Sequence, residues 1–281
     1  MCTTCGCGSD EITIEGMAGG SRAHVHAHDE HHHHHHHHHE ELPAHGRIVS
    51  LEQDVLAKNQ LFAERNRGWF EGSGVLAVNI MSSPGAGKTT ILERTIREWG
   101  GSAAISVLEG DQASSEDADR IRAAGATAVQ INTGTGCHLD AHMVAHGIEQ
   151  LKLSRDSVLL IENVGNLVCP ALFDLGERAR VLVVSVTEGE DKPVKYPHMF
   201  CVADLLLLNK LDLLPYVRFD IQRFKKLTLQ TNPHLQIIPL SAQTGEGMRD
   251  WYRWLTLSAA QHQDAKPRIS ELANAVPLKR L

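Results

Sequence analysis

The chain has 281 residues, of which 42% are hydrophobic, and it carries a formal net charge of −7. This length and apolar content suffice for one main folded domain with short tails. The acidic balance and the lack of a basic block argue against nucleic acid as the main partner, and no apolar run is long enough to span a membrane. Because its start shows no leader pattern, the chain is expected to be cytoplasmic. In that reducing compartment the six cysteines are free thiols or metal ligands rather than disulfides.

Residues 1–47 are dominated by Gly, Ser, Glu and His without apolar periodicity, and they predict a disordered metal-binding arm. The arm begins with a CxxCxC arrangement in which Cys2, Cys5 and Cys7 can converge on one ion. Three thiolates suit a thiophilic metal, and the free α-amine beside Cys2 is a feasible fourth ligand. That set favours planar Ni²⁺ over tetrahedral Zn²⁺. The alternative is a tail of reactive thiols.

The arm also contains an uninterrupted histidine run at 31–39. Neutral imidazoles without fixed geometry suit several weakly held metal ions, which predicts a metal reservoir. An expression tag is the alternative. A tag is normally placed at a chain end, whereas this run follows a natural-looking start, so the native reservoir is the preferred interpretation.

The folded part is expected to begin with a leading helical segment at 48–72, in which Ser50 and Gln53 have capping-box spacing and predict a helix at about 50–68. Seven short apolar runs then alternate with helical stretches over a nucleotide-binding domain at 73–265, and a tail follows at 266–281. Because the runs are nearly continuous rather than alternating, they predict a mostly parallel sheet with helices on both faces. The predicted strands are 75–81, 103–108, 127–131, 158–161, 181–186, 205–208 and 237–240.

The first predicted strand is followed by the segment SSPGAGKT at 82–89 and then by a helical pattern, which is the context of a phosphate-binding loop. The loop N–H groups and the helix dipole can bind phosphate oxygens, Lys88 supplies a charge, and the Thr89 hydroxyl can bind Mg²⁺. The segment departs from the pattern GxxxxGK(S/T) because Ser82 replaces the first glycine. The alternative is a chance glycine-rich turn. The expected nucleotide contacts are Pro84, Gly85, Ala86, Gly87, Lys88, Thr89 and Thr90.

The segment NKLD at 209–212 follows a predicted strand and resembles the guanine-specificity element of GTPases. A carboxylate at Asp212 accepts hydrogen bonds from the ring N–H and the exocyclic amine of guanine, whereas adenine would leave it unpaired. The segment after the last strand resembles the second base-contacting loop of these proteins. Either segment alone is equally an ordinary turn, but together they favour GTP and GDP over adenine nucleotides. The expected base contacts are Asn209, Lys210, Asp212, Ser241, Ala242 and Gln243.

Two carboxylates at predicted strand ends, Asp111 and Glu162, are expected to bind Mg²⁺ together with Thr89, because open α/β sheets bind substrates at the carboxyl ends of their strands. A helix cap or a solvated turn is the alternative for each. The predicted catalytic set is Lys88, Thr89, Asp111 and Glu162. No Gln or Arg is identified that would orient the attacking water, so slow hydrolysis is expected.

A second metal site is predicted inside the folded domain, where Cys137, His138 and Cys169 all fall on loops expected near the nucleotide. The alternative for a lone cysteine is a buried apolar filler, which is the interpretation adopted for Cys201. Two further histidines, His142 and His146, could join the site, but a solvated helix face is the preferred interpretation.

Taken together, several segments resemble the HypB family: CTTCGC at 2–7, the histidine run, SPGAGKTT at 83–90, GTGCHLD at 134–140, ENVGNLVCP at 162–170 and NKLD at 209–212. The segment TEGEDKP at 187–193 also resembles this family, but no role is assigned to it from its chemistry.

The resemblance implies a P-loop NTPase with a SIMIBI-type G domain that helps insert nickel into the precursor of the NiFe-hydrogenase large subunit, together with a HypA-like metallochaperone. It further implies a homodimer favoured by GTP, in which Cys137, His138 and Cys169 bind Ni²⁺ or Zn²⁺ near the subunit interface. The alternatives are a nickel storage protein, a GTPase that serves another nickel enzyme such as urease, and a purely regulatory switch.

Overall fold

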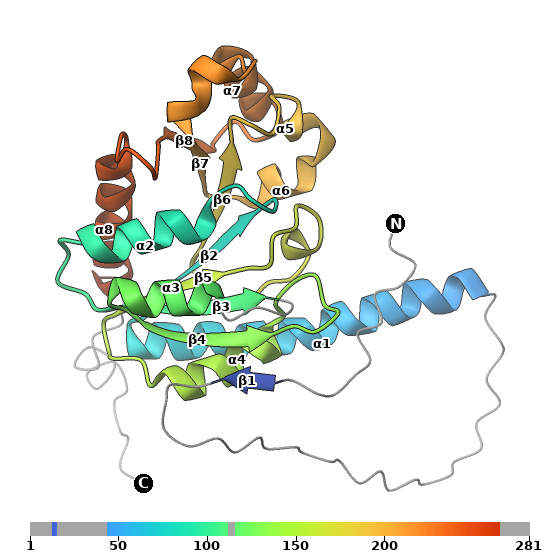
Figure 1. The fold of residues 1–281 in the computed structure, drawn as a ribbon. Coiled ribbons are helices and arrows are strands. Elements are labelled where there is room, and N and C mark those ends of the chain that lie inside the picture. Colours follow the sequence, from blue (N-terminus) through green and yellow to red (C-terminus); the bar gives the residue numbers. More distant parts are fainter. Residues whose placement is uncertain (1–12, 16–43, 112–115, 265–281) are drawn as a thin grey trace, which may run out of the picture.

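The computed structural model describes residues 13–15, 44–111 and 116–264, which form an eight-stranded sheet in the order β1-β4-β3-β5-β2-β6-β7-β8 (Figure 1). Each of the seven predicted strands overlaps one of β2–β8, and these seven strands pair in parallel as predicted. The strands are β1 Thr13–Glu15, β2 Leu76–Ser82, β3 Ile105–Asp111, β4 Thr127–Asn132, β5 Val158–Glu162, β6 Ala179–Ser185, β7 Leu205–Asn209 and β8 Gln236–Pro239.

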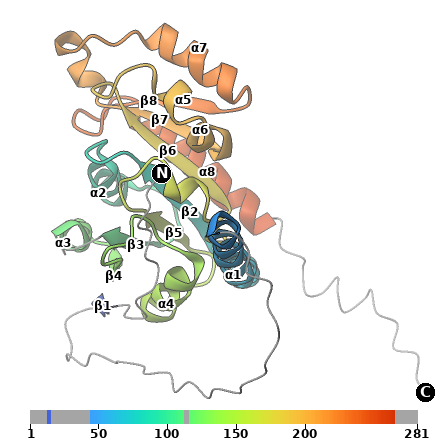
Figure 2. The same cartoon turned by 90° about the vertical axis from the view of Figure 1, so that its right-hand side faces the viewer.

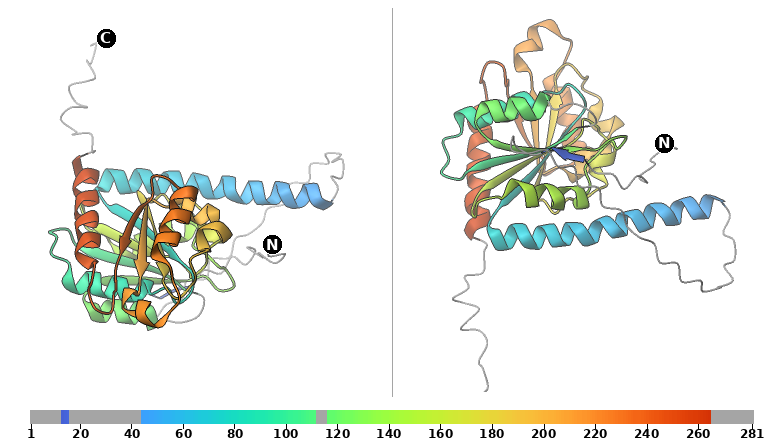
Figure 3. Two further views of the ribbon diagram at one scale, coloured as in Figure 1. Left: turned by 90° about the horizontal axis from the view of Figure 1, so that it is seen from above. Right: turned by 60° about the horizontal axis from the view of Figure 1, so that its bottom comes forward.

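Helices connect the parallel strands and cover both faces of the sheet, with α2, α3 and α8 on one face and α1 and α4 on the other (Figures 2 and 3). The α-helices are α1 Ala44–Ser73, α2 Lys88–Glu98, α3 Glu116–Ala124, α4 Ala141–Leu151, α5 Lys192–Lys195, α6 Pro197–Val202, α7 Ile221–Thr231 and α8 Met248–Asp264. Two 3₁₀ helices, η1 Cys169–Ala171 and η2 Leu211–Tyr216, lie in the loops that follow β5 and β7.

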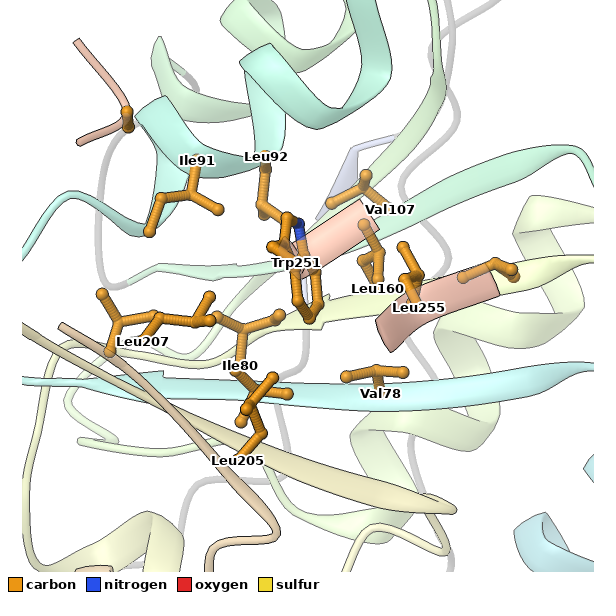
Figure 4. Packing of buried hydrophobic residues seen from close by; sticks show 14 of the residues in the cluster. Val78, Ile80, Ile91, Leu92, Val107, Leu160, Leu205, Leu207, Trp251 and Leu255 are labelled. Carbon is orange, nitrogen blue, oxygen red and sulfur yellow. The ribbon is translucent and has the colours of Figure 1, made fainter. Parts of the chain in front are cut away.

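The central strand β2 shows why the strands read as continuous apolar runs. Alternate residues of a strand point to opposite faces of the sheet. Val78 and Ile80 belong to the cluster that contains Trp251 of α8 (Figure 4), whereas Ala77 belongs to a second cluster with Phe70 of α1. All seven residues of β2 are buried. A strand that is buried on both faces has no exposed face, so its sequence does not alternate between apolar and polar residues.

Two expectations about the start of the folded part are corrected. Helix α1 begins at Ala44, so Ser50 lies inside the helix and is not its cap. Residues Thr13–Glu15 pair with β4 as an antiparallel edge strand, although they fall within the predicted disordered arm. The remainder of that arm up to residue 43, including Cys2, Cys5, Cys7 and the histidine run, lies outside the described residues, as does the predicted tail at 266–281. None of the described helices is long and apolar enough to cross a membrane.

Candidate nucleotide and metal site

The loop between β2 and α2 has the geometry of a phosphate cradle. Gly85 and Gly87 adopt positive φ angles of 72° and 98°, a conformation that glycine reaches without steric cost. A Cβ atom at Gly87 would lie 2.5 Å from the side-chain nitrogen of Asn209, so a larger residue does not fit there. Among the described residues, no side chain caps the N-terminus of α2. The first-turn N–H groups and the positive end of the helix dipole are therefore available to a phosphate.

The departure of Ser82 from the expected glycine has a structural explanation. Ser82 is the last residue of β2 and is not among the described residues with a positive φ, so its position does not require glycine. Its hydroxyl accepts a hydrogen bond of 2.9 Å from the ammonium group of Lys88. Because a P-loop lysine reaches the β and γ phosphates, this contact marks the Ser82 end of the loop as the end nearest those phosphates.

The two predicted base segments meet at the other end of the loop. Asn209 donates to the carbonyl of Ala86 at 2.9 Å and accepts from the N–H of Ala242 at 3.1 Å. Lys210 has a left-handed backbone (φ 65°), and its ammonium group donates to the carbonyl of Gly85 at 2.6 Å. A pocket of about 230 Å³ lies between these segments and the phosphate loop. It is lined by Gly87, Thr90, Asn209, Lys210, Asp212, Leu213, Ala242 and Gln243.

The Asp212 carboxylate lies in this pocket and is oriented by the neighbouring loop. Its Oδ1 accepts a hydrogen bond of 2.5 Å from the hydroxyl of Ser241. Ser241 is fully buried, and its own hydroxyl accepts from the N–H of Thr244 at 3.1 Å. An oriented carboxylate at the wall of the pocket is suited to the two hydrogen-bond donors on one edge of guanine.

Buried carboxyl groups lie at the ends of β3 and β5, beside the phosphate loop. Glu162 accepts a hydrogen bond of 2.7 Å from the Thr89 hydroxyl, and Glu109 stands opposite Glu162 in the pairing of these strands. Burial, followed by the charge of Glu162, raises the pKa of Glu109 to about 9. Burial also raises the pKa of Glu162 to about 7, opposed by the charge of Lys88 and the hydrogen bond from Thr89.

These carboxyl groups fit a divalent cation. The Oε2 atoms of Glu109 and Glu162 are both buried and have no hydrogen-bond partner among the described residues. A buried oxygen without a partner is costly, and the cost is removed if a cation or its bound water occupies the space. Asp111 ends β3, and its charge adds to the rise in the pKa of Glu109.

Glu109 was not predicted from the sequence. The sequence does contain an indication of its position, because Glu109 and Asp111 are two residues apart in one strand. Their side chains therefore point to the same face of the sheet. The intervening Gly110 faces the other side, where a Cβ atom would lie 2.6 Å from Leu139.

The structure brings Cys137, His138 and Cys169 together. Their candidate ligand atoms all lie within 4.8 Å of one another, and the two sulfur atoms are 3.0 Å apart. The sulfur of Cys137 is 3.7 Å from Nδ1 of His138. Burial lowers the pKa of His138, which keeps the imidazole neutral and able to bind a metal ion. The ring of His138 packs against Phe173, with the ring centroids 3.9 Å apart.

The segment after Glu162 connects this metal triad to the phosphate loop. Asn163 is buried, and its side-chain oxygen accepts a hydrogen bond of 3.0 Å from the N–H of Leu139, the residue after His138. Asn166 donates to the carbonyl of Cys137 at 3.3 Å. On the opposite side, a Cβ atom at Gly165 would lie 3.0 Å from Cα of Pro84, so glycine allows this segment to approach the phosphate loop closely.

Three further residues differ from or refine the expectations. Cys201 is exposed, which makes its assignment to the core wrong: the neighbouring Phe200 is buried in the short helix α6, and Cys201 points away. His142 and His146 are half-buried rather than fully solvated. Their Nε2 atoms are 3.1 Å apart, and His142 packs against Phe62 of α1.

The segment 187–193, for which the sequence suggested no role, contacts the phosphate loop. Glu188 accepts hydrogen bonds from the Ser83 hydroxyl and, at 2.9 Å, from the N–H of Ser185. The ammonium group of Lys192 lies 3.4 Å from the same carboxylate. Glu188 is therefore a loop-fastening residue that the sequence analysis missed, since its partner is distant in the chain.

Known proteins match this chain over most of its length. Residues 76–239 match the family described as "CobW/HypB/UreG, nucleotide-binding domain". The hydrogenase maturation factor HypB of Escherichia coli K12 is 45% identical over 284 residues, which cover 91% of this chain and 98% of that protein. The factor of the same name from Rhizobium leguminosarum bv. viciae is 57% identical over 215 residues, which cover 76% of this chain and 72% of that protein.

A crystal structure of HypB from Helicobacter pylori in complex with nickel shares the fold, with a TM-score of 0.69 and 34% sequence identity over 75% of this chain and 99% of that chain. The nucleotide-binding match covers more than half of the chain, and the Escherichia coli relative is matched nearly end to end. The chain is therefore a P-loop NTPase that belongs to the HypB family of hydrogenase maturation factors.

Proposed function

We propose that this protein is a GTPase metallochaperone that binds nickel at Cys137, His138 and Cys169 and inserts it into the precursor of the hydrogenase large subunit. The observation that carries the proposal is the direct connection between the two sites. Glu162 contacts Thr89 of the phosphate loop, and the next residue, Asn163, contacts the backbone beside His138. A change at the phosphates therefore has a short path to the metal ligands. The nickel-bound relative from Helicobacter pylori supports nickel as the cargo.

In this proposal the phosphate loop binds GTP, Lys88 offsets the charge of the β and γ phosphates, and Asp212 selects guanine. Thr89, Asp111 and Glu162 would hold Mg²⁺, with Glu109 in support. The buried Oε2 atoms of Glu162 and Glu109, which lack a hydrogen-bond partner in the described part of the chain, support this assignment. When held by these residues, Mg²⁺ would stabilise the negative charge that develops during hydrolysis. Glu162 is only 3% exposed, so its carboxylate is shielded from bulk water that would compete for the cation.

The metal triad is suited to bind nickel and to release it to a partner. Two thiolates and a neutral imidazole suit Ni²⁺ and also Zn²⁺. Cys137 and Cys169 are only partly buried, so a partner can reach the bound ion. Val168 and Leu172 flank Cys169 and are 54% and 53% exposed. Apolar side chains beside a metal site support a contact surface there, which fits the proposed GTP-favoured homodimer and the proposed HypA-like partner.

The proposal is tested by following radioactive nickel from the loaded protein to the purified hydrogenase large-subunit precursor. Transfer should require GTP and should be lost with a non-hydrolysable GTP analogue. Lys88→Ala, which removes the charge facing the phosphates, should retain nickel but fail to transfer it. Transfer that is equally fast without nucleotide would indicate a storage protein. Transfer to a urease precursor but not to the hydrogenase precursor would identify a different client and refute the proposed one.

A further inference from the structure

Arg94, in the middle of α2, extends from the helix that starts at the phosphate loop to the loop that follows β8. Its Nη1 atom donates hydrogen bonds of 3.1 Å to the carbonyl of Ala242 and 3.1 Å to the carbonyl of Gln243. The Arg94 side chain is 27% exposed, so these contacts are partly shielded from water. One planar guanidinium group thus holds two successive backbone carbonyls of a loop that lines the nucleotide pocket.

The loop is folded closely over this guanidinium group. Gly245 has a φ of +89°, and a Cβ atom added to it would lie 2.5 Å from Nη2 of Arg94. Ser241 and Gly245 close the turn through a backbone hydrogen bond of 2.8 Å, and the N–H of Ser241 donates to the carbonyl of Glu246 at 2.9 Å. Glycine at this position lets the loop backbone lie directly against Arg94.

The loop in turn orients the residues that face the base. Ser241 donates to Asp212, and the N–H of Ala242 donates to Asn209. The hydrogen bonds of Arg94 end on the carbonyls of Ala242 and Gln243, which follow Ser241 directly. A shift of these peptide groups would therefore move the Ser241 hydroxyl away from the Asp212 carboxylate.

Arg94 is itself held in place from two directions. Its Nη2 atom lies 2.9 Å from Oε1 of Glu98, one helical turn further along α2. The Oε2 atom of Glu98 accepts a hydrogen bond of 2.9 Å from the hydroxyl of Tyr252 in α8. The position of the guanidinium group is therefore fixed by α2 and α8, and not by the loop alone.

We propose that Arg94 is a positioning residue for guanine specificity: by holding the carbonyls of Ala242 and Gln243, it keeps the Ser241–Asp212 pair aligned with the exocyclic amine of guanine. This inference rests on the proposed guanine site. Because Arg94 and Lys88 both belong to α2, this one helix supports the phosphate end and the base end of the pocket.

The test compares the affinities of GDP and IDP, measured by isothermal titration calorimetry on the parent protein, on Arg94→Gln and on Arg97→Gln. IDP lacks only the exocyclic amine that Asp212 is proposed to bind. Arg97 lies on the same helix, is 59% exposed and pairs with Glu93 at 3.5 Å, so its variant removes the same charge away from the loop. Thermal melting of each variant reports any general loss of stability.

We expect Arg94→Gln to reduce the preference for GDP over IDP by about tenfold, because the misplaced carboxylate loses a charge-assisted hydrogen bond that only GDP makes. Arg97→Gln should keep the preference of the parent. Arg94→Lys keeps the charge but has one nitrogen in place of the two that contact Glu98 and the loop carbonyls, so it should restore thermal stability without restoring the preference.

An unchanged preference in Arg94→Gln would overturn the inference, whatever its melting temperature. If Arg94→Gln does not fold, Arg94→Lys decides the question, because full recovery of the preference in that variant contradicts the role given to the planar guanidinium group. A parent protein that binds ADP as tightly as GDP would refute the proposed guanine site instead, so the two failures are distinguishable.

Discussion

At the scale of single residues, the proposed chemistry depends on a few side chains whose orientation is fixed by contacts distant in the chain. The Asp212 carboxylate is oriented by a hydrogen bond from Ser241, and the Glu162 carboxylate by one from Thr89. Lys210 adopts a strained left-handed backbone that turns its ammonium group back onto Gly85. These residues lie at or after the carboxyl ends of parallel strands, where the fold concentrates its loops.

Replacing Asp212 by Asn is expected to weaken GDP binding by about 10- to 100-fold and to relax the choice of base. The amide cannot accept two donors, so it loses a charge-assisted hydrogen bond to guanine. Fluorescence titration with GDP and XDP measures the effect. Asp250→Asn, an exposed substitution in the first turn of α8, is the matched control and should leave both affinities unchanged. Equal GDP affinity in Asp212→Asn and the parent would contradict the proposed base contact.

At the scale of elements, the segment 186–191 connects the phosphate loop to α7. Glu188 contacts Ser83 and Ser185, whereas Glu190 pairs with Arg223 of α7 at 3.2 Å and accepts from the N–H of Asp220 at 3.2 Å. Two glutamates of one short loop therefore contact opposite neighbours. This arrangement allows the contribution of the phosphate-loop contact to be separated from that of the loop as a whole.

Glu188→Gln should weaken the binding of GTP and GDP by about fivefold, since it removes the charge from a hydrogen bond that fixes the phosphate loop. Glu190→Gln should leave both affinities within experimental error of the parent. Stopped-flow measurements with a fluorescent nucleotide give the two affinities. Equal losses in both variants would show that the loop acts only through its general stability.

Helix α1 is fastened to the domain by polar side chains as well as by apolar contacts. Arg67 pairs with Asp174 at 2.5 Å, and Asn66 donates to the carbonyls of Ala141 and Leu175. Burial opposes the ionisation of Asp174, but the N–H of Gly176 and the charge of Arg67 hold its pKa below the usual range.

Asp174→Asn should lower the free energy of unfolding by about 1–3 kcal/mol near neutral pH, through loss of the charged partner of Arg67. Because the pKa of Asp174 is lowered in the folded state, its stabilisation is present above the unfolded-state pKa and is lost as the pH falls through the folded-state value. The difference from the parent should therefore shrink below about pH 4 in urea unfolding. Asp191→Asn, which removes an exposed pair with Lys195, is the control. A difference that stays constant into acid would contradict the assignment.

The sequence predicted the parallel sheet well, because strands buried on both faces leave continuous apolar runs such as residues 205–208 in β7. It failed for Thr13–Glu15, which is too short and too polar to show periodicity, and for the start of α1, where Ser50 imitates a cap within a longer helix. The structure brings Cys137, His138 and Cys169 together as their segments indicated, and the roles of the site residues on recognisable segments stay predictions. Glu109, Glu188 and Arg94 were not predicted, because strand register and loop closure decide what a buried charge contacts, and a single sequence contains no direct record of either.

At the scale of the whole molecule, the amino-terminal arm is proposed to supply metal capacity rather than catalysis. A variant that starts at Ala44, where α1 begins, should lose the tightest nickel site and most of the bound nickel. It should hydrolyse GTP at close to the rate of the full chain, since the only described element that it lacks is the edge strand β1. Equilibrium dialysis and phosphate release measure the two properties. Full-length protein with Cys2, Cys5 and Cys7 replaced by Ser should lose the tight site but keep the histidine capacity. Loss of hydrolysis in the shortened variant would show that the arm contributes to the nucleotide site.

The central claim is that the nucleotide and metal sites are coupled through the segment from Glu162 to Cys169. By linkage, any factor by which GTP alters nickel affinity is also the factor by which nickel alters GTP affinity. The decisive measurement is the nickel affinity of the variant starting at Ala44, compared between its complexes with GDP and with a non-hydrolysable GTP analogue, and repeated with Cys169→Ala. The two nucleotide states should differ by about 5- to 150-fold, and the difference should collapse in Cys169→Ala. Identical nickel affinity in both states would contradict the account, because the two sites would then share a fold without exchanging free energy.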